Sequence, residues 1–329
     1  MPTRRVTRPV PARRVTHPDR EPEQKDRGAR GEMKWSLSLL GAALVVFMLR
    51  DVFHTLWHPT RHGGLSRLAM TTLWRLSGRM SGRRRAAGLA GPLGMVVVVS
   101  IWALTVAVGW ALVYWPHMPE AFTYSAGLEP SAHAGPVDAL YVSLVTLATL
   151  GLGDIAPTAG WLRLFAPLEA LVGFALLSAT VTWILGIYPA LARRRTLALR
   201  LSHLRRTHAT TEALDSDAGA AILDSVASEL CVVSIDFMQY PESYYFYDGD
   251  DRASLAEQIG YAAQLAEHAA KARHRDVGLA SEVLRAAMDD LAAILDERFL
   301  RTEGSTGAVL DAYAAEHRVR ADGVKKSHG

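Results

Sequence analysis

The chain has 329 residues, a formal net charge of +3 and 50% hydrophobic side chains, and this length allows one or two domains. A single cysteine, Cys231, excludes an internal disulfide and any paired-cysteine metal or redox motif. Its apolar neighbours predict that it packs as a small hydrophobic residue. Apolar side chains are concentrated before about residue 190, and the remainder has the composition of a soluble helical protein.

Residues 1–32 are predicted to be a disordered basic tail, because they hold too few large apolar side chains to offset the entropy of ordering. The arginines of this tail suit either a solvated segment or contact with anionic lipid headgroups. Met33 follows directly, so Met1 and Met33 are alternative starts of the chain.

A first hydrophobic helix is predicted over residues 33–58. The segment from Trp35 to Trp57 has about the ~20 residues needed to cross ~30 Å of hydrocarbon, and a tryptophan marks each interface. A signal peptide is disfavoured, because no small-residue cleavage site follows. Residues 59–90 carry arginines but no acid. They are predicted to be a cytoplasmic linker that includes a helix on the membrane surface.

Two further apolar runs, about 92–115 and 161–191, enclose a stretch without lysine or arginine. We assign residues 91–192 to one membrane module and residues 193–329 to a helical cytoplasmic domain with a basic tail. The arginine clusters on either side of the module belong in the cytoplasm by the positive-inside rule. Residues 116–160 then face outward, which predicts a segment that enters the membrane between two spanning helices and returns to the same side.

Three crossings place the N-terminus outside, although nine basic residues in 1–32 should resist translocation. Either translation starts at Met33, or the segment from Trp35 to Trp57 is a hairpin or surface helix that does not cross. We favour the first explanation, since the arginines of the linker outweigh Lys34.

The re-entrant segment contains the motif "TLATLGLGD" after a predicted short helix, residues 136–148. Non-helical backbone at membrane depth is tolerated only where it is buried in protein or lines a watery path. Glycines allow backbone conformations in which successive carbonyls turn toward one axis, where they replace the hydration shell of an ion. One chain supplies only one wall of such a ring, so several copies are needed.

At this motif the sequence resembles the potassium channel pore family, whose signature is approximately T-x-x-T-x-G-[YF]-G-D. The resemblance implies a tetramer with K⁺ as the permeant ion, held by the carbonyls of residues 149–152 and the Thr149 hydroxyl. It also implies a hinge glycine in the inner helix, Gly173, and a central cavity near Ser178, Val181 and Thr182. The filter residues that it implies are Thr149, Leu150, Gly151, Leu152, Gly153 and Asp154.

Two departures from the family pattern concern the support of this filter. Leu152 replaces the usual aromatic residue, although a G-L-G filter also resembles the second pore repeat of some two-pore-domain potassium channels. Tyr141 and Val142 stand where the family has paired tryptophans. We therefore expect a weaker cuff around the filter, and faster inactivation or more sodium permeation than in relatives with an aromatic filter. An unchanged selectivity and inactivation in Leu152→Tyr would contradict this expectation.

The C-terminal region is predicted to be an all-helical domain over about residues 210–302. Its apolar residues recur at helical spacing, and "QYPESYYFYDGDD" interrupts the helices. The tyrosines of that segment suit bundle packing better than a ligand pocket, and the histidines show no metal-like spacing with acids. No nucleotide-binding glycine motif appears. The packing residues are Ile222, Val226, Leu230, Val233 and Phe237, then Leu284, Met288, Leu291, Leu295 and Phe299.

The sequence therefore predicts an all-α, multi-pass cell-membrane protein that is a potassium-selective channel regulated by its helical cytoplasmic domain. Two alternatives stay open: a weakly selective cation channel, and a non-conducting membrane scaffold that acts through residues 210–302. No catalytic constellation, cofactor motif or nucleic-acid partner is expected. Membrane lipid and further copies of the chain are the expected partners, and the gating stimulus and cytoplasmic regulator are not specified.

Overall fold

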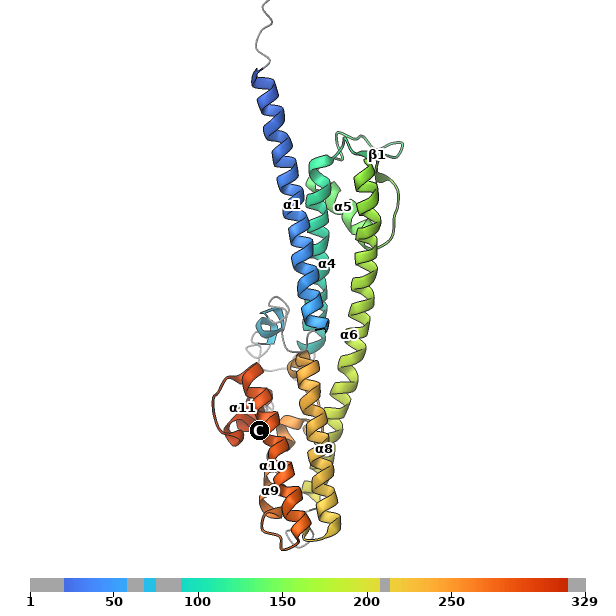
Figure 1. Cartoon of the computed structure of the whole chain (residues 1–329). Helices are drawn as coiled ribbons and strands as arrows, with labels where there is room; N and C mark the ends of the chain where they lie inside the picture. The colour runs from blue at the N-terminus through green and yellow to red at the C-terminus, as the bar shows by residue number, and fades with distance from the viewer. Residues whose placement is uncertain (1–20, 58–67, 75–89, 208–213, 319–329) are drawn as a thin grey trace, which may run out of the picture.

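The computed structural model describes residues 21–57, 68–74, 90–207 and 214–318. Three long helices, α1, α4 and α6, form the upper part of an elongated molecule, and a helical bundle forms the lower part (Figure 1). A two-stranded antiparallel sheet, β1–β2, lies at the upper end. The elements are α1 (Glu21–Trp57), α4 (Ala90–Tyr114), η1 (Trp115–His117), β1 (Phe122–Tyr124), α5 (Pro136–Leu147), β2 (Ile155–Pro157), α6 (Gly160–Arg206), α8 (Asp217–Gln239), η2 (Pro241–Tyr245), α9 (Leu255–Ala269), α10 (Arg275–Leu295), η3 (Asp296–Leu300) and α11 (Thr306–His317).

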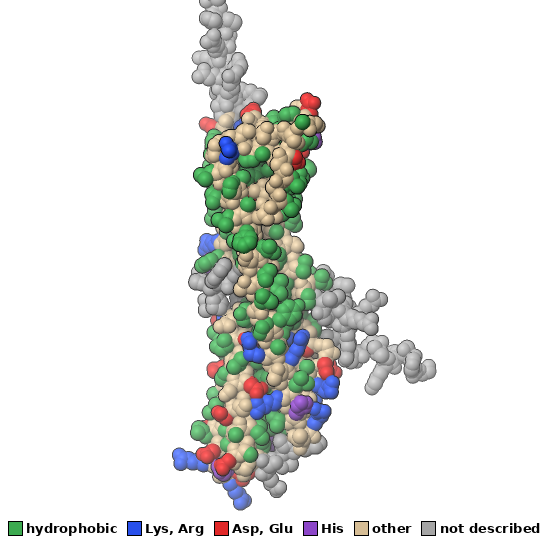
Figure 2. All heavy atoms as spheres, turned by 90° about the vertical axis from the view of Figure 1, so that its right-hand side faces the viewer, with side chains coloured by type: hydrophobic (Ala, Val, Ile, Leu, Met, Phe, Trp, Pro, Cys, Tyr) green, Lys and Arg blue, Asp and Glu red, His purple; other side chains and the backbone are tan. Residues whose placement is uncertain are grey.

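The prediction of an all-α, multi-pass membrane protein is confirmed. By length and composition, four described segments can cross a membrane: Gly31–Thr55, Gly91–His117, Gly160–Arg206 and Asp217–Gln239. On the α6 side of the molecule, charged side chains gather on the lower part, whereas the upper part is mainly apolar and neutral (Figure 2). The apolar part matches the helices that lipid would surround.

Helix α1 runs antiparallel to α4 along its length (Figure 1). Near the upper end, Lys34 Nζ lies 3.0 Å from Glu120 Oε2, at the same end as the β1–β2 sheet. Toward the opposite end, the Trp102 ring N–H donates to Asp51 Oδ2 at 3.1 Å. The segment from Trp35 to Trp57 is therefore one continuous helix packed beside α4 rather than a hairpin, and its crossing of the membrane stays a prediction.

Two of the predicted boundaries are wrong. Helix α1 begins at Glu21, so residues 21–32 are helical rather than a disordered tail, while residues 1–20 lie outside the described part. The inner helix does not end near residue 192, because α6 continues as one helix to Arg206. Its 47 residues span about 70 Å, which is more than twice the ~30 Å thickness of hydrocarbon. The lower half of α6 therefore projects beyond the membrane.

The helical C-terminal domain has its own core. Eight of the ten predicted packing positions, among them Leu230 and Leu291, are buried there. Phe299 packs against this core and is partly buried, whereas Ile222 is half-buried and lies outside the core. The domain extends past residue 302, since α11 adds Val309 and Tyr313 to the same core. The prediction for Cys231 is wrong, because this cysteine is exposed on α8.

The tyrosine-rich segment around η2 packs between the domain and the membrane helices. Tyr244 is fully buried and stacks on Phe299 with ring centroids 4.1 Å apart. The ring of Tyr247 stacks at 4.2 Å on Trp74, which belongs to the helical residues 68–74 of the linker. The packing role predicted for these tyrosines is confirmed. Most of the basic linker, residues 58–67 and 75–89, lies outside the described residues.

Candidate functional site

The site begins with the short helix α5, which packs against α4 and α6 (Figure 1). Pro136 opens the helix, where its missing N–H costs nothing. Asp138 Oδ2 accepts a hydrogen bond from the Gly135 N–H at 3.0 Å and so caps the first turn. The helix ends at Leu147, as the sequence predicted to within a residue, directly before the glycine motif.

Hydrogen bonds hold both ends of the motif. On the upstream side, the N–H groups of Thr149 and Leu150 donate to the carbonyls of Thr146 and Val145, both at 2.9 Å. On the downstream side, β2 pairs with β1, and the Ser125 N–H donates to the carbonyl of Asp154 at 2.8 Å. Residues 149–154 are therefore a non-helical span stretched between a pore helix and a sheet.

The backbone of this span alternates in handedness. Thr149, Gly151 and Gly153 have φ values of 59°, 54° and 76°, whereas Leu150 and Leu152 have no positive φ. Alternating right- and left-handed residues gather successive N–H groups on one side of the chain, so the carbonyls gather on the other. Two of the three left-handed positions are glycine, which adopts them without steric cost, while Thr149 accepts some strain.

The span is largely uncovered within one chain. The side chains of Leu150 and Leu152 are 66% and 63% exposed. At the outer end, the Tyr141 hydroxyl donates to Asp154 Oδ2 at 2.7 Å. Tyr141 therefore links the pore helix to Asp154, the last residue of the motif. This hydrogen bond is not predicted from the sequence, where Tyr141 is recognised only as a replacement for a tryptophan of the family.

The inner helix packs tightly against the end of the pore helix at Gly173. A Cβ atom placed on Gly173 would lie 1.8 Å from the carbonyl oxygen of Leu147. Close packing against Leu147 therefore explains why a glycine occupies this position. Its role as a hinge stays a prediction. The residues predicted for a central cavity, Ser178, Val181 and Thr182, lie on the side of α6 that one chain leaves partly or fully exposed.

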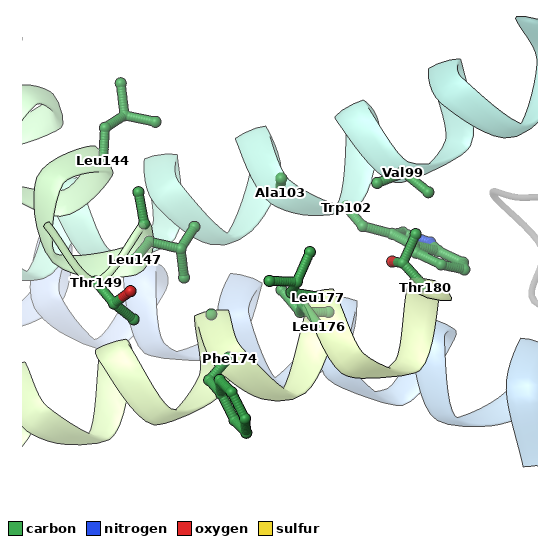
Figure 3. Close-up of a pocket in the computed structure, with 12 residues that line it drawn as sticks. Val99, Trp102, Ala103, Leu144, Leu147, Thr149, Phe174, Leu176, Leu177 and Thr180 are labelled. Carbon is green, nitrogen blue, oxygen red and sulfur yellow. The ribbon is translucent and has the colours of Figure 1, made fainter. Parts of the chain in front are cut away.

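An apolar cavity of about 440 Å³ lies between α4, α5 and α6, below the start of the motif (Figure 3). Within the non-helical span of residues 149–154, Thr149 lines the cavity, and the predicted cavity residues Ser178, Val181 and Thr182 do not. The lining residues are Val99, Trp102, Ala103, Leu144, Leu147, Ala148, Thr149, Gly173, Phe174, Leu176, Leu177 and Thr180.

Sequence reasoning did not identify Glu169, which is fully buried in α6. Its carboxylate accepts hydrogen bonds from the hydroxyls of Tyr114 in α4 and Ser143 in α5, both at 2.5 Å. A signal was present, because Glu169 is the single acid in the third apolar run, and ionisable residues within spanning segments are rare and often functional.

A small group of ionisable side chains lies at the start of α10 in the helical domain. His274 does meet acids, since its ring, Asp217 and Asp276 bring three ligand atoms within 4.8 Å of one another. Asp217 is 91% exposed, and exposed clusters of this kind need no ion. The cluster therefore identifies no metal centre.

Comparison with known proteins agrees with this geometry. Residues 95–188 match the family described as ion channel. A 55-residue stretch is 46% identical to two-pore potassium channel 5 from Arabidopsis thaliana. The stretch covers 16% of this chain and 14% of that channel. Over 224 residues, 66% of the chain, it is 25% identical to the uncharacterized membrane protein YdjJ from Bacillus subtilis (strain 168).

The similarity to these relatives is partial. The chain spans 63% of the length of the Bacillus protein and 14% of the Arabidopsis channel. No solved structure matches the chain. The family match coincides with α4, α5, the glycine motif and the first part of α6, which are the elements that build the site, and it points to a channel rather than an enzyme.

Proposed function

We propose that this chain, whose residues 95–188 match the ion channel family, assembles as a tetrameric potassium channel that is regulated by its helical domain. The observation that carries the proposal is the alternating backbone of residues 149–153. A row of carbonyls on one side of an extended chain can replace the water ligands of a dehydrated cation. The Thr149 hydroxyl would add an oxygen at the inner end of the row.

The exposure of this row supports assembly. One chain contributes one wall, and its carbonyls need facing carbonyls to surround an ion, which four copies around an axis provide. In such a ring, neighbouring copies would cover the exposed side chains of Leu150 and Leu152. The exposed face of α6 that carries Ser178, Val181 and Thr182 would then line the path below the filter.

The end of the pore helix favours a cation at this place. The carboxyl end of a helix carries a partial negative charge, and α5 ends at Leu147, beside the cavity and just before Thr149. At the outer end, Asp154 supplies a carboxylate next to the last carbonyls. K⁺ preference is the finer part of the proposal. Leu152 has no hydroxyl with which to brace the filter, so a weakly selective cation channel is the second candidate.

Regulation is proposed because the helical domain is fastened to the inner helix. Arg193 donates two hydrogen bonds to Asp236 of α8, at 2.8 and 2.5 Å. The next residue, Arg194, is buried, donates to the carbonyls of Ser243 and Phe246, and pairs with Asp248 at 3.1 Å. A movement of the domain would therefore pull directly on the helix that lines the conduction path.

The first test is the reversal potential of the purified protein in a planar bilayer, with KCl on one side and NaCl on the other. A reversal near the potassium equilibrium potential supports the proposal, and a reversal near zero supports the weakly selective channel. Gly151→Ala should abolish the current, because a residue with a Cβ resists the φ of 54° at this position.

A second test does not require an open gate. K⁺ bound in the filter stabilises the folded tetramer by mass action, about 2.7 kcal/mol at 100 times the dissociation constant. The melting temperature should therefore rise with KCl more than with NaCl, and Gly151→Ala should remove the difference. Gly260→Ala is the matched control, since a Cβ at Gly260 in α9 meets open space. Equal melting in both salts, with no current, would favour the scaffold.

A further inference from the structure

The buried carboxylate of Glu169 joins three separate elements. Tyr114, the last residue of α4, and Ser143, in the second half of α5, each donate one hydroxyl to a different oxygen of the carboxylate. All three side chains are at most 1% exposed. Among the residues that the structure describes, Glu169 forms no ion pair with a lysine or arginine.

Burying the carboxyl group of Glu169 costs free energy, so its presence at this junction calls for an explanation. Moving a carboxylate out of water carries a penalty of several kcal/mol, which hydrogen bonds offset only when they are well formed. An apolar residue of similar size would close the same junction without this cost. Glu169 does not meet the conduction path either, because it is fully covered by protein within one chain. Its two partners indicate what it does instead.

The hydrogen bond from Ser143 connects the carboxylate to α5, the helix that directly precedes the filter. One turn further along α6, Gly173 lies against the carbonyl of Leu147. Two successive turns of the inner helix therefore contact the second half of α5. The first filter residues in turn bond back to the last turn of α5 through the carbonyl of Val145. A displacement of α5 along α6 would therefore shift the first carbonyls of the filter.

We propose that Glu169 is a positioning residue that holds the pore helix in register with the inner and outer helices and thereby keeps the filter in its ion-binding form. This inference rests on the proposed function. It adds that the K⁺ affinity of the filter depends on a side chain that no ion touches.

The variants remove one interaction at a time. Glu169→Ala removes both hydrogen bonds, while Ser143→Ala and Tyr114→Phe each remove one and leave the carboxylate in place. Glu169→Gln keeps the shape and can hydrogen-bond both hydroxyls once one of them accepts from the amide. Ser38→Ala is the matched control, since Ser38 is a buried serine of α1 that bonds to the carbonyls of Lys34 and Val113 but not to α5.

The readout is the KCl concentration at which the melting temperature of the full-length tetramer rises, compared with the same titration in NaCl. We expect Ser143→Ala to raise the KCl midpoint several-fold, as for the loss of one buried hydrogen bond. Glu169→Ala should have a larger effect, Glu169→Gln should restore most of the affinity, and Ser38→Ala should match the wild type. The double variant Glu169→Ala with Ser143→Ala should be no worse than Glu169→Ala alone.

A purely structural role gives a different result. It would lower the melting temperature equally in KCl and NaCl and leave the KCl midpoint unchanged, and that outcome would overturn the inference. If Glu169→Ala yields no tetramer, Ser143→Ala and Glu169→Gln carry the test. A wild-type protein that melts identically in both salts would instead refute the proposed function itself, so the two failures are distinguishable.

Discussion

Substitution of Gly173 by alanine tests whether the inner helix is packed against the pore helix at this point. The added Cβ would lie 1.8 Å from the carbonyl oxygen of Leu147, whereas even close carbon–oxygen contacts keep about 3.3 Å. Helix α6 must therefore move from α5 by roughly 1.5 Å, judged from that carbon–oxygen limit. Overpacking of this kind costs typically 1–3 kcal/mol, and the better helix propensity of alanine returns about 1 kcal/mol.

The assay is the melting temperature of the full-length protein in NaCl, so that K⁺ is absent from the measurement. We expect Gly173→Ala to lower the melting temperature by a few degrees, because the net cost of overpacking against helix propensity reaches about 2 kcal/mol and a chain of this size loses a few degrees for that amount. Gly160→Ala is the control on the same helix, because a Cβ there meets nothing, and it should be neutral or slightly stabilising. An unchanged or raised melting temperature for Gly173→Ala, together with altered gating, would refute the packing argument and favour the hinge.

Three further outcomes follow from the contacts of the helical domain and the filter mouth. Arg194→Met should cost about 2–5 kcal/mol of unfolding free energy, because the buried carbonyls of Ser243 and Phe246 lose their donor. Arg195→Met should cost under about 1 kcal/mol in denaturant titrations, because its side chain is 43% exposed and Arg194 still pairs with Asp248. Burial raises the pKa of Glu242 from 4.5 to about 7, so the folded state binds its proton more tightly and stability should fall by roughly 3 kcal/mol as pH rises from 4.5 through 7. Glu242→Gln should flatten this part of the melting profile, and an equal slope in both proteins would contradict the assignment. Tyr141→Phe, which removes the hydrogen bond to Asp154, should speed the decay of the K⁺ current by a few-fold without changing the melting temperature.

The sequence by itself determined the membrane module, because the signals there are local. Apolar runs of spanning length place α4 and the membrane part of α6. Pro136 and the apolar residues after it specify a short helix. Glycines at alternate positions mark where the backbone leaves the common φ region, and Gly151 and Gly153 do have positive φ values. The helical spacing of the C-terminal domain was equally readable, since its period reflects burial on one face.

The tertiary structure alone decided the contacts between elements. The partners of Glu169 lie 55 and 26 residues away from it in sequence, and no spacing rule connects them. The arginines at 193–195 lie at the predicted edge of the membrane module, yet α6 continues through them, and Asp236 and Asp248 of the folded domain pair with them. Cys231 looked like a core residue from its neighbours but faces away from the packed side of α8. The local sequence pattern determines which helices, strands and turns can form. The contacts of a polar or small side chain depend on distant elements that pack together and bury it, so the sequence pattern does not predict them.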